Sequence, residues 1–255
     1  MSASDSKPAS RLAFIALGLG LLLVGVVAGW LWESQRTGPA DGMAARDRAA
    51  VEQVVREYIL ANPEILPEAM ENLQRKANEK QLASVGEDLE KPFPGAVMGN
   101  PDGKVVLVSF SDFGCTYCRQ SVADVDALIR DNPDLKVVLR ELPILSPASG
   151  EAAKWGLAAA EQGRYPQFHR AMFAAGRPDA ATIEAAAKVA GLDMDRARRI
   201  IAEPRVTAEL DRNIELARQL GFNGTPSWAV GDQLLSGAVG REVLQKAIDE
   251  ARDAA

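Results

Sequence analysis

The sequence predicts an α/β fold in which two groups of short strands are separated by a long block of helices. Apolar runs at residues 105–110 and 135–142 flank an amphipathic segment, which favours a strand–helix–strand unit with a parallel strand pair. Residues 147–220 are rich in alanine and follow helical periodicity between glycine and proline breaks. The remaining predicted elements are a short first strand at 96–98, two strands at 228–230 and 233–235, and a final helix at 241–251.

The bulk composition excludes several classes of function. The chain has 255 residues, 35 acidic against 29 basic side chains, and a net charge of −6. A nucleic-acid-binding protein would carry a basic patch or stripe, so we expect no nucleic-acid partner. Two cysteines and one histidine are a poor supply for zinc, which usually takes four Cys, His or carboxylate ligands. We therefore expect no metal site.

An uncharged apolar run at residues 12–32 predicts a transmembrane anchor. It is long enough to cross a bilayer core of about 30 Å at about 1.5 Å per residue. Trp30 and Trp32 stand at its far end, as in an aromatic belt, and Lys7 and Arg11 precede it, which places residues 1–11 in the cytoplasm. The alternative is a cleaved signal peptide, whose apolar region is shorter and ends in small residues. Both alternatives deliver the rest of the chain to the far side of the membrane.

Two helices are predicted between the anchor and the main domain. Residues 33–43 form a linker, and residues 44–90 form a helical leader with apolar positions at helical spacing. Asn62 and Pro63 are expected to cap and begin the second helix. The leader either oligomerises the chain, packs on the main domain or is a stalk without a partner. A proline- and glycine-rich stretch then opens the main domain, residues 91–255, with its helical insertion at about 147–220.

Cys115 and Cys118 carry the chemistry predicted for the chain. They are its only cysteines, they follow an apolar strand and Gly114, and they stand at the start of a helix. A single Cys-x-x-Cys indicates a redox or metal dithiol, because so small a loop constrains the unfolded chain little. Helix N-terminal N–H groups favour a thiolate, so Cys115 is the expected nucleophile and Cys118 the resolving thiol. Thr116 and Tyr117, between them, are expected to tune the redox potential. Asp112, close before the motif, opposes ionisation of Cys115 if it is ionised and near.

Several stretches together resemble the DsbA-like branch of the thioredoxin fold, a family of thiol-disulfide oxidoreductases. The resemblance covers residues 91–252. The stretches are FGCTYC, PILSPASGEAA, YPQFHRAMF and GFNGTPSW, in this order along the chain. The leader sequence YILANPEILPEAMENL resembles a subgroup that includes the copper-sensitivity suppressor ScsC and Com1-type proteins. Many relatives have proline where this chain has Thr116 and an acidic residue where it has Ser109, and both differences bear on the redox potential.

The resemblance implies a second part of the site at Thr225 and Pro226. In the family the peptide bond before this proline is cis, lies against the dithiol and offers backbone hydrogen bonds to an extended substrate. Sequence statistics alone favour a trans bond, because cis is found at about 5–6% of X–Pro bonds. The resemblance also implies no cofactor beyond a redox-active Cys115–Cys118 disulfide. His169 is expected to be structural, and Phe113 and Trp228 either line an apolar patch or belong to the core.

Taken together, these features predict a membrane-anchored thiol-disulfide oxidoreductase of the bacterial inner membrane with its catalytic domain in the periplasm. Its expected partners are unfolded or misoxidised extracytoplasmic proteins, a membrane protein that resets the dithiol, the lipid bilayer through residues 12–32, and further copies of the chain. The ScsC-like leader and Thr225 favour an isomerase or reductase over a dedicated oxidase. The alternatives are a dithiol that handles copper(I) through soft thiolates and a scaffold in which the dithiol is incidental.

Overall fold

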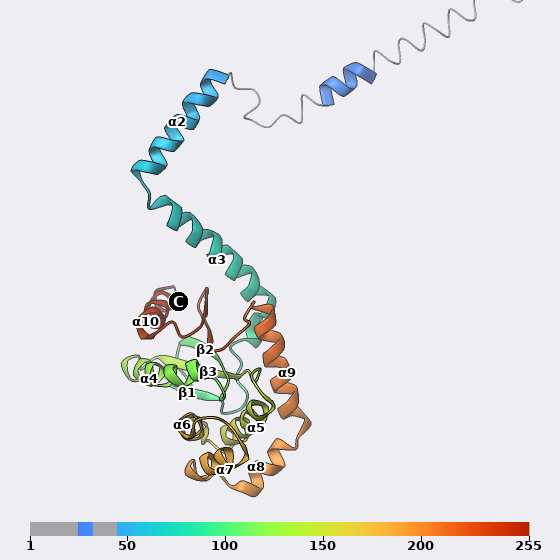
Figure 1. The fold of residues 1–255 in the computed structure, drawn as a ribbon, viewed down its shortest axis with the longest axis vertical. Helices are drawn as coiled ribbons and strands as arrows, with labels where there is room; N and C mark the ends of the chain where they lie inside the picture. Colours follow the sequence, from blue (N-terminus) through green and yellow to red (C-terminus); the bar gives the residue numbers. More distant parts are fainter. Residues whose placement is uncertain (1–24, 33–44, 255) are drawn as a thin grey trace, which may run out of the picture. The chain divides into compact units, whose positions relative to one another are not determined.

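A computed structural model describes residues 25–32 and 45–254 of the chain (Figure 1). Residues 25–32, the end of the predicted anchor, are helical. The other residues of that anchor, the cytoplasmic segment 1–11 and the whole predicted linker 33–43 lie outside the described residues. Within the two described ranges, no helix combines the length and the apolar character needed to cross a membrane.

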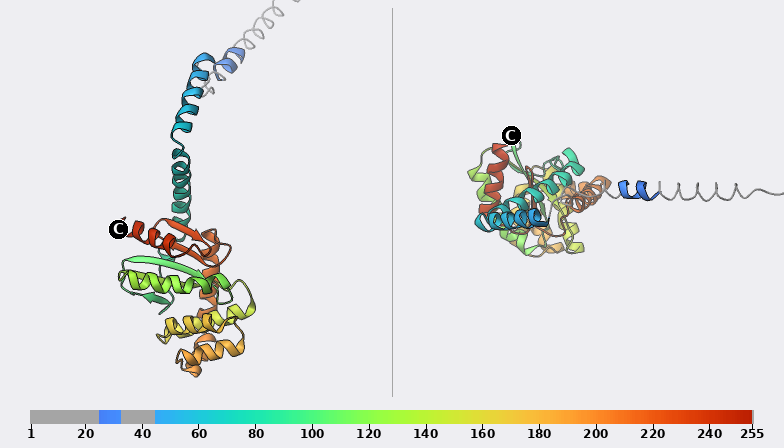
Figure 2. Two further views of the ribbon diagram at one scale, coloured as in Figure 1. Left: turned by 60° about the vertical axis from the view of Figure 1, so that its left-hand side comes forward. Right: turned by 90° about the horizontal axis from the view of Figure 1, so that it is seen from above.

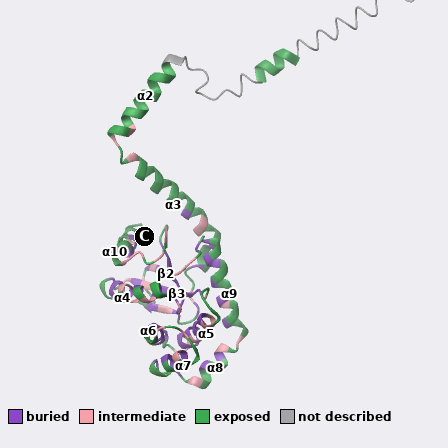
Figure 3. Cartoon of the chain, viewed as in Figure 1, coloured by how far each residue is buried: buried purple, intermediate pink, exposed green. Residues whose placement is uncertain are grey.

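The chain divides into two compact units, the first ending at Ala69 and the second beginning at Met70. The first unit contains α2 (Ala45–Ala61) and the start of α3 (Ile65–Val85). The expectation that Asn62 caps α3 is wrong, because its side-chain amide donates back to Tyr58 O of α2 at 2.9 Å and α3 begins three residues later. Most residues of α2 are exposed, apolar ones included (Figure 3).

The second unit is built on a five-stranded sheet in the order β1-β3-β2-β4-β5. The predicted parallel pair is confirmed: β2 runs parallel to β3, with Val105 opposite Leu135 and Ser111 opposite Glu141. The other neighbours are antiparallel. The strands are β1 (Val97–Gly99), β2 (Val105–Ser111), β3 (Leu135–Glu141), β4 (Ser227–Val230) and β5 (Gln233–Ser236).

Both faces of the sheet are buried, which accounts for the nearly continuous apolar runs of β2 and β3. The helices α4 (Thr116–Asp131) and α10 (Arg241–Asp253) cover one face, where Leu107 and Val137 join one core cluster (Figure 2). The helix α9 (Pro204–Gln219) and the end of α3 contribute to the other core cluster, which contains Val108 and Phe110.

The helical block expected at about 147–220 is confirmed. It consists of α5 (Pro147–Glu161), α6 (Tyr165–Ala175), α7 (Ala180–Val189), α8 (Met194–Ile201) and α9. Ser146 caps α5 by accepting a hydrogen bond from Ser149 N, and Asp179 and Thr182 form a capping box at α7. The block joins the sheet core through Phe168 and Met172 of α6, which are fully buried.

A buried arginine fixes the segment between α3 and β1. Arg140 of β3 is 1% exposed and donates to the main-chain oxygens of Leu89 and Lys91, the second at 2.6 Å. Its charge pairs with Glu209 of α9 at 2.8 Å, and Asn213 accepts a further hydrogen bond. Each donor therefore has an acceptor, which a buried guanidinium requires.

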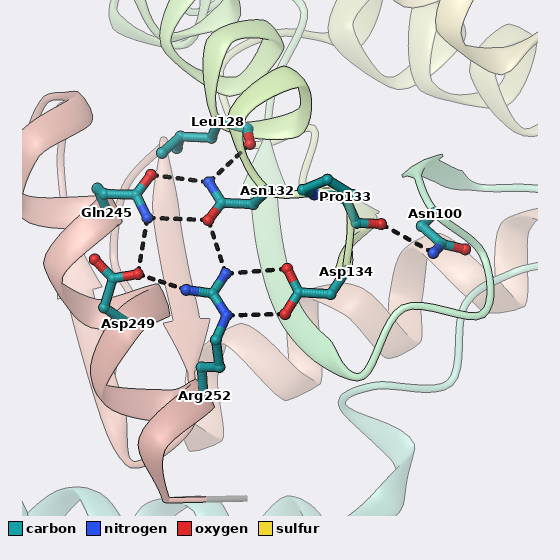
Figure 4. Close-up of polar contacts among 8 residues, drawn as sticks. All are labelled: Asn100, Leu128, Asn132, Pro133, Asp134, Gln245, Asp249 and Arg252. Carbon is teal, nitrogen blue, oxygen red and sulfur yellow. Dashed lines mark hydrogen bonds and ion pairs between the residues drawn. The ribbon is translucent and has the colours of Figure 1, made fainter.

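A polar network ties α10 to the turn between α4 and β3 (Figure 4). Arg252 binds both carboxylate oxygens of Asp134, at 2.8 and 3.0 Å, and also donates to Asn132 Oδ1 and Asp249. Asn132 and Gln245 exchange side-chain amide hydrogen bonds. Because Asn132 is the C-cap of α4, the network holds the C-terminal end of that helix, while the cysteines lie at its N-terminal end.

Candidate functional site

The cysteine pair lies where β2 passes into α4. Cys115 N donates to Asp112 O at 2.9 Å and Gly114 N donates to Asp112 Oδ1 at 2.7 Å, which closes a tight turn before the helix. Cys115 is the N-cap of α4, and its Sγ accepts a hydrogen bond from Cys118 N at 3.3 Å. Gly114 has to be small, because a Cβ there would lie 2.7 Å from Ser149 Oγ. The local sequence therefore places the first sulfur on the N–H groups at the start of the helix.

Both thiols are reduced in this structure, and their pKa values are shifted in opposite directions. The pKa of Cys115 is lowered to about 5, chiefly because the Cys118 side chain donates a hydrogen bond to its sulfur, while burial opposes the shift. The pKa of Cys118 is raised, first because its proton is held by Cys115 and second because of burial. At neutral pH the first sulfur is therefore a thiolate and the second a thiol, as a nucleophile and its resolving partner require.

The predicted partner loop lies against this pair. The Thr225–Pro226 peptide bond is cis, as the resemblance implied. In the thiol form Cys115 Sγ donates to Thr225 O at 3.2 Å, so residues 110 apart in the sequence meet at the sulfur. The buried Thr225 Oγ1 lies near enough to lower the pKa of both thiols, although it makes no hydrogen bond of regular geometry. Thr225 and Pro226 are thus brought to the dithiol.

The two residues between the cysteines face solvent. Thr116 and Tyr117 are both exposed, Tyr117 by 63%. The main-chain N–H of Tyr117 is one of the groups that lower the pKa of Cys115. An exposed aromatic ring two residues from a reactive sulfur is accessible to a bound polypeptide.

Aromatic rings of α6 pack against Phe113 of the dithiol turn. Phe113 is buried and packs edge-on against Phe168, with ring centroids 5.6 Å apart, and also contacts Phe173 and His169. Burial lowers the pKa of His169 to about 4, so the ring is neutral at physiological pH. His169 therefore belongs to the core, as the structural interpretation expected, and Phe113 and Trp228 are core residues rather than an exposed patch.

Two carboxyl groups lie near the turn: Asp112, which was expected from the sequence to act only through its charge, and Glu141, which was not recognised from it. Asp112 is buried and accepts hydrogen bonds from Gly114 N and Leu145 N, the second at 3.0 Å. An aspartate two residues before a glycine is the signal that could have identified this turn. Glu141 ends β3 and accepts a 2.5 Å hydrogen bond from Tyr165 Oη. Burial raises the pKa of Glu141 to about 8, and the charge of Asp112 adds to the shift.

Comparison with known proteins assigns these elements to a family. The model of the DSBA-like thioredoxin domain matches residues 106–249, and that of the N-terminal domain of copper resistance protein ScsC matches residues 47–80. A thioredoxin-like oxidoreductase from Silicibacter pomeroyi is 40% identical with a TM-score of 0.63, over 66% of this chain and 98% of that chain.

Two further solved structures resemble this chain. Proteus mirabilis ScsC is 29% identical with a TM-score of 0.63, over 84% of this chain and all of that chain. The thiol-disulfide exchange protein α-DsbA2 from Wolbachia pipientis is 28% identical with a TM-score of 0.65, over 70% of this chain and 97% of that chain.

A Na⁺/H⁺ antiporter NhaA of Salinispora tropica is 31% identical over 60% of this chain, and the match spans 24% of the antiporter's length.

Proposed function

Because the chain belongs to the DSBA-like thioredoxin-domain family, we propose that it is a thiol-disulfide oxidoreductase acting on extracytoplasmic proteins. The observation that carries the proposal is the pairing of a low-pKa Cys115 with a protonated Cys118 at one helix start, beside a cis-proline loop. A purely structural pair of thiols has no need of such a difference in acidity.

The exchange proceeds in two nucleophilic steps. The Cys115 thiolate attacks one sulfur of a substrate disulfide, forming a mixed disulfide and releasing the other substrate sulfur as a thiolate, which takes up a proton. Cys115 then no longer carries the negative charge that held the proton on Cys118, so Cys118 ionises more readily. Its thiolate attacks Cys115 Sγ, the substrate leaves as a dithiol, and the Cys115–Cys118 disulfide forms. The reverse sequence oxidises a substrate dithiol.

Within this class, we propose isomerase or reductase activity rather than that of a dedicated oxidase. The ScsC-type leader and Thr225 before the cis-proline support this direction. The low pKa of Cys115 acts in the opposite direction, because a stabilised thiolate makes the disulfide more oxidising. A pKa of about 5 lies between the values of thioredoxin, about 7, and DsbA, about 3.5. The expected reduction potential therefore lies between about −270 and −120 mV, and a value at the DsbA end would contradict the proposed direction.

We also propose that residues 12–32 anchor the protein in the inner membrane, with residues 1–11 in the cytoplasm and the oxidoreductase domain in the periplasm. The uncharged apolar run and the preceding basic residues support this. A membrane protein that resets the dithiol would be its redox partner. Membrane fractionation tests the anchor: recovery in the soluble periplasmic fraction, with an N-terminus beyond Trp32, would mean a cleaved signal peptide.

The leader is proposed to join copies of the chain. In the first unit Val51, Val54, Val55 and Tyr58 of α2 are exposed at helical spacing, as a helix-packing face would be in a separated chain. Light scattering of the detergent-solubilised protein, compared with Val54→Glu, tests this. An unchanged mass for the two proteins would contradict it.

Insulin reduction and refolding of scrambled ribonuclease test the proposed activity directly. The wild type is expected to be active in at least one assay, and Cys115→Ser in neither. An inactive wild type would remove the proposal. Copper(I) handling is a second candidate because the leader matches a domain named for copper resistance. In that case the wild type would bind copper(I) stoichiometrically without turning over disulfides, and Cys115→Ser would lose that binding.

A further inference from the structure

Asp112 has a buried carboxylate whose hydrogen bonds go to main-chain groups on two separate segments. The residue is 1% exposed. Its Oδ1 accepts from Gly114 N at 2.7 Å and its Oδ2 from Leu145 N at 3.0 Å. A buried carboxylate is costly unless its oxygens are satisfied. Each carboxylate oxygen of Asp112 accepts a hydrogen bond from one of these two N–H groups, so the side chain is held in one position.

The first of these bonds shapes the turn that carries Cys115. Together with Cys115 N donating to Asp112 O at 2.9 Å, it fixes Cys115 as the N-cap of α4. In that position its sulfur meets Cys118 N. The main-chain N–H of Asp112 also lowers the pKa of Cys118. One residue therefore contacts the main chain or sulfur of both cysteines.

The second bond fastens that turn to the segment between β3 and α5. This segment begins where Leu142 N donates to Ser111 O at 2.7 Å and ends at Ser146, the N-cap of α5. Leu145 N lies between these two fixed points, and its bond to Asp112 connects the segment to the cysteines. The bond to Leu145 therefore adds a direct link between the dithiol turn and the start of the helical block, where Ser149 of α5 also lies beside Gly114.

We propose that Asp112 is a positioning residue of the dithiol, which keeps Cys115 Sγ on the N–H groups of α4 by fastening the Asp112–Cys115 turn to Leu145. The inference rests on the proposed function only in taking Cys115 as the reacting group. It differs from the simpler expectation that Asp112 is a charged neighbour that disfavours a second negative charge on Cys115.

The two roles predict opposite signs for loss of the charge. If Asp112 acts through its charge, Asp112→Asn lowers the pKa of Cys115 by removing repulsion. If it positions the turn, the amide presents an N–H₂ group to one of the two N–H donors, one bond is lost, and the pKa of Cys115 rises. Two other titratable groups interact with Asp112: Cys118 on α4, which its main-chain N–H faces, and Glu141 on β3, whose pKa Asp112 helps to raise; Tyr165 on α6 donates to Glu141.

The test is a titration of the reduced full-length protein by the ultraviolet absorbance of the thiolate. The proposal expects the pKa of Cys115 to rise in Asp112→Asn by about one unit, which is about a tenfold smaller thiolate fraction at low pH. Asp126→Asn is the control for loss of one carboxylate: it removes the ion pair between Asp126 of α4 and Arg170 of α6, eight residues beyond Cys118, and should leave this pKa unchanged.

Asp112→Ser provides a second variant if Asp112→Asn does not fold. Its hydroxyl can accept from Gly114 N but cannot reach Leu145, so the bond to Leu145 is lost and the pKa of Cys115 is expected to rise at least as far as in Asp112→Asn. An unchanged or lower pKa in the folded Asp112 variants would overturn the proposal, and so would an equal rise in Asp126→Asn. Because the titration does not use exchange activity, an inactive wild type would refute the proposed function without affecting this comparison.

Discussion

The acidity of Cys115 should depend most on its neighbour Cys118. The Cys118 thiol is the largest of the groups that bring the pKa of Cys115 to about 5. A hydrogen bond to a charged acceptor is worth about 1.5–3 kcal/mol, which corresponds to about 1–2 pKa units. Cys118→Ala removes this donor and keeps the main-chain N–H that also faces the sulfur at 3.3 Å. The pKa of Cys115 is therefore expected to rise to about 6–7, still below that of a free cysteine.

The assay is the pH dependence of iodoacetamide alkylation, which reports the thiolate of Cys115. At about pH 6 the thiolate fraction should fall from about nine-tenths in the wild type to about half or less in Cys118→Ala. Cys118→Ser is the matched control, because its hydroxyl remains a donor and the rise should be smaller. A pKa that stays near 5 in Cys118→Ala would refute the reasoning, since the helix N-terminus alone would then account for the acidity.

Three further predictions concern the surroundings of the dithiol. Thr225→Val should raise the pKa of Cys115 by less than Cys118→Ala does, because its hydroxyl is a smaller cause of the shift; a larger rise would reverse that order. Burial raises the pKa of Glu141 from 4.5 to about 8, so wild-type stability should fall as pH rises between these values. The difference of about 3.5 between these pKa values corresponds to about 5 kcal/mol, so Glu141→Gln should abolish a fall of about that size in urea unfolding; parallel curves would contradict this. Gly156→Ala should destabilise the protein by about 1 kcal/mol, because its Cβ would lie 3.0 Å from Glu141 Oε1 and 3.2 Å from a Phe113 ring atom. Gly150→Ala in the same helix has no atom within 4 Å of its Cβ and should stabilise the protein by up to about 1 kcal/mol. Equal effects at the two glycines would show that the close contact at Gly156 is harmless.

The order of the elements and the position of the cysteines could be predicted from the sequence, because both depend on local patterns. Apolar runs bounded by glycine and proline gave the strands, and the run into Gly114 and Cys115 gave the helix start. The pairing of the dithiol with Thr225 and Pro226 depends on contacts across the fold, and it came from the family resemblance. The frequency of cis X–Pro bonds alone favoured a trans bond at that proline.

The parts of the site that were missed depend on tertiary contacts. Glu141 stands in a strand buried on both faces, so no alternation distinguishes its inward position. Asp112 was expected to act by its charge, whereas its carboxylate binds two main-chain N–H groups, one of them 33 residues away. Asn62 was misassigned because a side-chain amide can serve the helix before it as well as the helix after it.

Trapping a mixed disulfide tests the central claim, that Cys115 is the attacking sulfur of an exchange reaction. Cys118→Ala and Cys115→Ala are each incubated with oxidised glutathione near neutral pH and analysed by intact mass and peptide mapping. We expect one glutathione on Cys115 of the first variant and a much slower reaction at Cys118 of the second, because the pKa of Cys115 is low, whereas burial still raises the pKa of Cys118 when Cys115 is absent. No adduct on Cys115, or a faster adduct on Cys118, would contradict it.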